Sequence, residues 1–89
     1  MNILKRNGNN AVFDITKIIA AIAGANKEVE QEHQLQAEDI KNIAGKVAAK
    51  VVEGTHVETI QDSVEDTLFD KGAFKDAKTY ITYRYKRDL

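Results

Sequence analysis

Three basic side chains near the amino terminus are the residues best suited to chemistry in this 89-residue sequence. Lys5 and Arg6 stand beside Gly8, and Lys17 follows where a helix is expected to begin. Ammonium and guanidinium groups next to unpaired backbone N–H groups bind phosphate. The pattern therefore indicates a local anion site. The alternative is that Lys5 and Arg6 only protect an exposed edge strand from aggregation, and the local pattern by itself slightly favours that alternative.

These cations belong to a predicted β-hairpin. Asn7 and Gly8 separate two short strand-like runs, and both residues tolerate the positive φ that a two-residue type I′ turn requires. In that register Arg6 faces Asn9, and the side chains of Lys5 and Arg6 point to opposite faces of the strand. Both can serve one ligand only if the hairpin is strongly twisted or bulged. A two-stranded hairpin is marginal alone, so it must lie on something.

The rest of the chain reads mainly as helix. Asp14 is a good N-cap for a helix that continues to about Ala25. Residues 27–36 are polar and are either a loop or an extension of that helix. A second helix is expected from near Ala37 to Gly54, with Gly54 as its left-handed C-cap.

Two further helices are predicted. The third begins after a cap at Thr55 or His56 and is closed by Gly72, and its acidic residues are expected to stay in water: Glu58, Asp62, Glu65 and Asp66. The fourth runs from about Ala73 into the carboxyl-terminal tail. Its spacing predicts that Phe74, Ala77, Ile81 and Tyr85 face the core, which leaves Tyr80, Tyr83, Arg84 and Arg87 on other faces.

Composition excludes several classes of function. With 13 Lys and Arg against 14 Asp and Glu, bulk charge does not favour a general nucleic-acid or membrane-surface binder. The sequence has no Cys and no apolar run long enough to cross a bilayer, which together predict a cytoplasmic protein. His33 and His56 lack partners at ligand spacing, so we expect no structural metal. We also find no catalytic motif.

Three segments, read in order, resemble the ATP-cone, a small nucleotide-binding regulatory module at the amino terminus of many ribonucleotide reductases. They are ILKRNGNNAVFD with the following ITKI, then HVETIQDSVEDTL, and finally AKTYITYRYKRD. They match that family's V-x-K-R-D/N-G…F-D…K-I opening, its I-Q-x-x-V-E helix and its A-x-x-Y-I-x-Y-R ending. The resemblance covers essentially the whole chain. It implies an α+β, mostly α, fold with a β-hairpin lid on a bundle of about four helices.

The resemblance also implies a ligand and a set of contacts. ATP or dATP, with Mg²⁺, would bind between lid and bundle. Lys5 and Arg6 match the family's basic pair that contacts the phosphates, and Lys17 matches a lysine of its first helix that lies near them. Asp14 would serve as N-cap or as a polar contact near the base.

Other positions carry over from the family's third and fourth helices. Val57 and Gln61 match positions that border the nucleotide. In the last helix Tyr80, Arg84 and Arg87 are further candidates and rank below the hairpin residues. The expected organisation is one domain over residues 1–89, with the lid at 1–13 and the helical bundle at 14–89.

The implied function is a non-catalytic allosteric sensor. Its partners would be a nucleoside triphosphate and a ribonucleotide reductase catalytic domain, in cis or in trans, with an oligomer that depends on nucleotide. The YITYRYKRD ending favours the anaerobic class of reductase. The alternatives are the cone of a nucleotide-sensing transcriptional regulator, a protein-interaction module that binds no nucleotide, and a small nucleic-acid binder that uses the basic aromatic tail.

Overall fold

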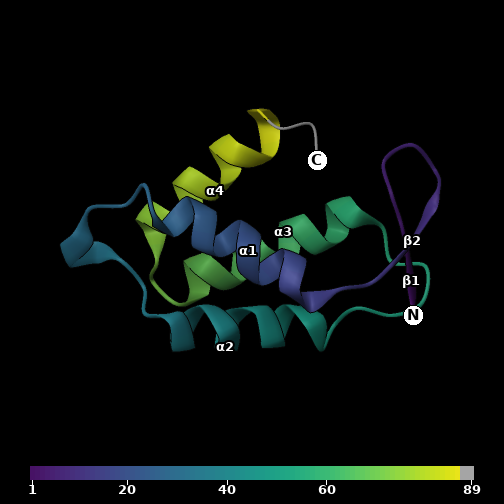
Figure 1. The fold of residues 1–89 in the computed structure, drawn as a ribbon, viewed down its shortest axis with the longest axis horizontal. Coiled ribbons are helices and arrows are strands. Elements are labelled where there is room, and N and C mark those ends of the chain that lie inside the picture. Colours follow the sequence, from purple (N-terminus) through teal and green to yellow (C-terminus); the bar gives the residue numbers. More distant parts are fainter. Residues whose placement is uncertain (87–89) are drawn as a thin grey trace.

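The computed structural model describes residues 1–86, which form an amino-terminal hairpin and four helices (Figure 1). The strands are β1 (Asn2–Leu4) and β2 (Asn10–Val12); the helices are α1 (Ile15–Asn26), α2 (Ala37–Ala48), α3 (Val57–Asp70) and α4 (Phe74–Lys86). Neighbours in the bundle are α1 with α2, α2 with α3, α3 with α4, and α4 with α1. This confirms the expected α+β, mostly α, fold.

The hairpin has a three-residue loop, so the expected two-residue turn is wrong. Strand pairing joins Ile3 to Ala11 and leaves residues 6–8 as the loop. The Gly8 N–H donates to the Lys5 carbonyl at 2.9 Å, and the Lys5 N–H donates to the Asn9 carbonyl at 2.8 Å. Gly8 has a positive φ of +85°, which suits a type I turn followed by a bulge. Arg6 therefore lies in the loop rather than in the strand, so the predicted alternation of its side chain with that of Lys5 along one strand does not apply.

The hairpin is fixed to the segment that connects α2 to α3, beside which it lies at one end of the bundle (Figure 1). The Leu4 N–H donates to the Thr55 carbonyl at 2.9 Å, and the Gly54 N–H donates to the Asn2 carbonyl at 2.8 Å. Leu4 also forms a parallel bridge with His56, the N-cap of α3. The hairpin thus rests on the start of α3, as a marginal two-stranded unit requires.

The start and end of α1 follow from two side chains. The Asp14 carboxylate accepts from the Thr16 N–H at 2.9 Å, as an N-cap does. The buried amide of Asn26 accepts from the Leu35 N–H and donates to the Leu35 carbonyl, at 2.9 and 3.0 Å. This pair folds residues 27–36 back as a loop with one 3₁₀ turn, Gln31–His33, which decides between the two alternatives for this stretch.

Helix α2 ends at Ala48, well before Gly54, so the predicted C-cap at Gly54 is wrong. The Thr55 hydroxyl accepts from the Val52 N–H at 3.0 Å and donates to the Val52 carbonyl at 2.8 Å. These bonds close a turn at residues 52–55, in which Gly54 has φ +83°. Val51 still reaches the core from this turn. Gly72, at φ +77°, does close α3 as predicted.

The core lies between the four helices and is built from branched aliphatic side chains. The most deeply buried of them are Ile22, Ile43, Val47, Val64 and Leu68. Within residues 1–86 no helix is long and apolar enough to cross a membrane.

The buried face of α4 differs from the predicted one. Phe74 and Tyr85 are 57% and 78% exposed, whereas Tyr80 and Arg84 are 5% and 8% exposed. Of the four residues predicted to face the core, Ala77 is the one that is fully buried. The prediction rested on helical spacing alone. The carboxylates of Asp62 and Glu65 on α3 make the burial of Arg84 possible.

Candidate functional site

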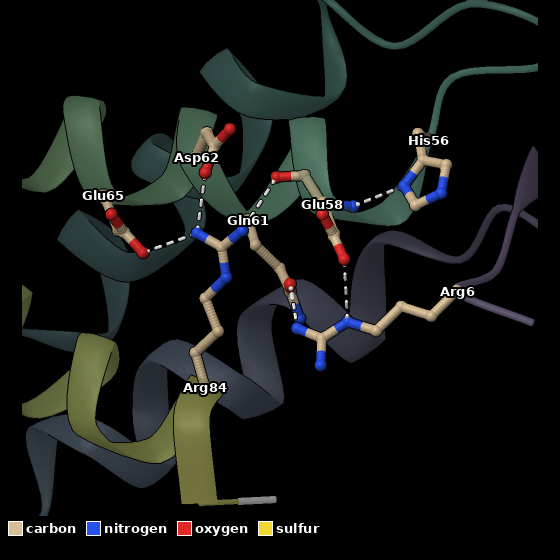
Figure 2. A network of polar contacts seen from close by, with 7 residues as sticks. All are labelled: Arg6, His56, Glu58, Gln61, Asp62, Glu65 and Arg84. Atoms are coloured by element: carbon tan, nitrogen blue, oxygen red, sulfur yellow. Dashed lines mark hydrogen bonds and ion pairs between the residues drawn. The ribbon is translucent and has the colours of Figure 1, made fainter. Parts of the chain in front are cut away.

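Arg6 reaches from the hairpin loop to the first turns of α3 (Figure 2). Its Nη2 donates to Oε1 of Gln61 at 3.0 Å, and its Nε lies 3.5 Å from Oε1 of Glu58. The Arg6 side chain is 30% exposed, that of Glu58 is 54% exposed, and Gln61 is buried. The structure therefore brings together two residues that the sequence assigned to the site, Arg6 and Gln61. Glu58 is a third member that sequence reasoning missed, because it read the acidic residues of this helix as solvated.

Arg84 is held by the same stretch of α3. Its Nη1 donates to Oδ1 of Asp62 and to Oε2 of Glu65, both at 2.7 Å, and its Nη2 donates to the Glu58 carbonyl at 3.3 Å. Burial alone would lower the pKa of Arg84, but the hydrogen bonds to the two carboxylates outweigh it and raise the pKa. The Glu65 side chain is only 20% exposed, so the expectation that it stays in water is wrong.

The charges of both arginines, Arg6 and Arg84, act on the phenol of Tyr80. Burial raises the pKa of its phenol to about 12, while the nearby charges of Arg84 and Arg6 oppose that rise. The hydroxyl therefore stays protonated throughout the physiological range. Tyr80 was predicted to lie off the core face, and its 5% exposure shows that it is instead part of the core.

The other predicted site residues lie nearer the solvent. Lys5 and Lys17 are exposed, and Val57 is half-buried at the first position of α3. Hydrogen bonds from Thr16 hold the pKa of Asp14 below its ordinary value, and the charge of Lys17 adds to this effect. Arg87 lies outside the described residues.

Three cavities of the molecule lie away from the hairpin. Their volumes are about 320, 480 and 260 Å³, and their walls include Asp76, Thr67 and Tyr83 respectively. Among the described residues, no predicted site residue lines any of these three cavities. The candidate site is therefore defined by the contacts of Arg6 and by the cations around the hairpin.

Two glutamates and His33 form a cluster that the sequence did not predict. Ligand atoms of Glu30, Glu32 and His33 lie within 4.8 Å of one another on exposed residues. The Glu30 carboxylate already pairs with Nζ of Lys75 at 3.2 Å, and this contact lowers the pKa of Glu30. The cluster is explained by this ion pair and gives no further indication of a ligand.

Comparison with known proteins assigns the family. The family model of the ATP cone domain matches residues 1–89. The chain belongs to the ATP-cone family. The cation-bearing hairpin on a four-helix bundle is thus the ATP-cone fold in this chain, as the three matching segments predicted.

Relatives of this ATP-cone are large reductases. It is 32% identical to the ribonucleoside-diphosphate reductase subunit alpha of Chlamydia muridarum, over 96% of this chain and 9% of that protein. It is 31% identical to the anaerobic ribonucleoside-triphosphate reductase of Haemophilus influenzae, over 98% of this chain and 12% of that protein. It is 36% identical to the vitamin B12-dependent ribonucleoside-diphosphate reductase of Mycobacterium tuberculosis, over 93% of this chain and 12% of that protein. The chain therefore spans about a tenth of the length of these relatives.

Proposed function

We propose that this ATP-cone binds ATP or dATP at the hairpin and thereby controls the activity of a ribonucleotide reductase, without catalysing a reaction itself. Residues 1–13 act as the lid and residues 14–89 as the bundle of one domain. The phosphates, with Mg²⁺, contact Lys5, Arg6 and Lys17, while Val57 and Gln61 border the nucleoside. Arg84 and Arg87 rank below them, since the Arg84 guanidinium is already held by two carboxylates.

One observation supports this proposal above the others. The Arg6 guanidinium crosses from the hairpin loop to Gln61 on α3, so a cation stands where the hairpin meets the bundle. A merely protective charge on an edge strand would point to solvent instead. The proposed site is therefore built from two separate parts of the fold, as a lid and its seat would be.

Regulation requires that ligands differ in their effect on conformation. A ligand that binds two states equally well shifts neither population. ATP and dATP must therefore hold the hairpin differently against the bundle, and the reductase catalytic domain, in cis or in trans, must respond to that difference. A nucleotide-dependent oligomer is one form that this response takes.

Calorimetric titration with ATP and with dATP, each with Mg²⁺, tests the proposal. We expect binding to the unmodified chain, and a loss of about 1.5–3 kcal/mol of binding free energy in Lys5→Ala and in Arg6→Ala, the scale of a hydrogen bond to a charged group. Lys41→Ala is the matched control, because Lys41 is exposed on α2 and belongs to no part of the proposed site. Absence of binding of both nucleotides at millimolar concentration would refute the proposal.

A further inference from the structure

The Glu58 carboxylate is paired with the Arg6 guanidinium, which the proposed ligand also needs. The Glu58 carboxylate lies 3.5 Å from Nε of Arg6 (Figure 2). We infer that Glu58 is an intramolecular competitor of the ligand phosphates: it holds Arg6 while the site is empty and must release it on binding. This inference rests on the proposed function and assigns to Glu58 a role in setting the affinity of that site.

The geometry makes such an exchange inexpensive. The carboxylate meets the guanidinium at a single long contact rather than through two parallel hydrogen bonds, and more than half of the Glu58 side chain is exposed. Exposed ion pairs of this kind contribute little to stability. A phosphate group carries more charge than a carboxylate and forms stronger, bidentate contacts with arginine. The phosphate should therefore displace Glu58 from Arg6.

The backbone of Glu58 is held in place at the start of α3. Its N–H donates to Nδ1 of His56 at 3.1 Å, and its carbonyl accepts from Arg84 at 3.3 Å. The residue before this turn, His56, is bridged to Leu4 of β1. We therefore expect movement on ligand binding at the side chains of Arg6 and Glu58 and in the hairpin loop, while the base of the hairpin stays fixed to α3.

Gln61 and Glu58 have different parts in this arrangement. Gln61 is neutral and buried, so its hydrogen bond orients the guanidinium without competing for its charge. Glu58 is the group of this pair that opposes an anion. Removing its charge should favour the ligand, whereas removing Gln61 should not.

The test measures the affinity of the whole chain for ATP and for inorganic triphosphate, each in Glu58→Gln and in the unmodified protein. We expect binding of both ligands to tighten about 2- to 5-fold, the range that exposed ion pairs allow. Asp66→Asn is the matched control, because it removes one charge from an exposed position on the same helix. Far-ultraviolet circular dichroism checks that helix content is unchanged.

A double-mutant cycle separates competition from simple repulsion of the ligand by Glu58. In the Arg6→Gln background there is no guanidinium for Glu58 and the ligand to compete for, so Glu58→Gln should then leave the affinity unchanged. Glu58→Asp retains the charge but withdraws the carboxylate by one methylene, and we expect it to tighten binding as well. This variant also retains an acidic residue at the start of α3, which protects the fold.

Three results would overturn the inference alone: an unchanged or weaker affinity in Glu58→Gln, an equal gain in Asp66→Asn, or a gain that persists in the Arg6→Gln background. Failure of the unmodified protein to bind ATP at all would instead refute the proposed function, and the inference with it.

Discussion

Arg84 should be a major contributor to stability, because it joins α4 to α3 through a desolvated guanidinium. Its side chain is 9% exposed and forms hydrogen bonds of 2.7 Å with both Asp62 and Glu65. Hydrogen bonds to charged groups are worth about 1.5–3 kcal/mol each when the partner is buried. Asp62 is 64% exposed, so its share is small, while Glu65 at 20% exposure would be left with an unpaired and partly buried charge. Arg84→Met should therefore lower the free energy of unfolding by about 2–4 kcal/mol, somewhat less than the loss of a fully buried ion pair.

Urea denaturation followed by far-ultraviolet circular dichroism measures this loss. Methionine retains the length of the aliphatic stem, so the comparison isolates the guanidinium. Lys86→Met is the control, since Lys86 is exposed in the last turn of the same helix and should change stability by less than about 0.5 kcal/mol. Adding Glu65→Gln to Arg84→Met should recover about 1 kcal/mol or more, because it removes the stranded charge. Equal stability of Arg84→Met and Lys86→Met, or no recovery in the double variant, would refute the reasoning.

Two further predictions concern pH. Burial raises the pKa of Tyr80 to about 12, so the free energy of unfolding should decrease as the pH rises from 10.0, the ordinary pKa of tyrosine, towards 12. Tyr80→Phe should remove that part of the decrease. Tyrosinate absorbance would contradict this prediction if all three tyrosines ionised together near pH 10. The pKa of Asp14 is depressed by Thr16, so its contribution is present above the unfolded value of 3.8 and is lost as pH falls through the folded value. Asp14→Ala should therefore lower the melting temperature at neutral pH while Asp14→Ser largely preserves it, and equal melting temperatures of these two variants would count against the cap.

Local bonds between side chains and the backbone were predictable from the sequence. Asp14 caps α1 as expected, His56 is one of the two residues expected to cap α3, and Gly72 ends α3 with a positive φ. In each case the deciding contact lies within a few residues of chain. The position of the hairpin was predictable for the same reason, since Asn7 and Gly8 favour a turn.

Features that depend on distant parts of the chain were not predictable. The three-residue hairpin loop is compatible with the same Asn-Gly sequence as a two-residue loop, and strand pairing selects between them. The burial of Arg84 depends on acceptors 19 and 22 residues earlier in the chain. Helical spacing alone predicted Tyr85 as a core residue, although Tyr85 is exposed and Arg84 is buried. Arg6 and Gln61, both assigned to the candidate site through the family resemblance, are in contact, but the sequence could not predict Glu58 as a neighbour of Arg6.

The stretch of α3 from Glu58 to Glu65 explains how one helix can serve both stability and a change of state. Three of its carboxylates lie against two arginines, one on the hairpin loop and one on α4. The Arg84 guanidinium is buried and its contacts with the two carboxylates are short, whereas the contact of Arg6 with Glu58 is long and half exposed. A polyanion that binds near the hairpin will therefore break the weaker pair first, because exposed ion pairs cost little to disrupt. We accordingly expect the packing of α3 on α4 to persist when ligand binds, and the contact between the hairpin loop and α3 to be the part that changes.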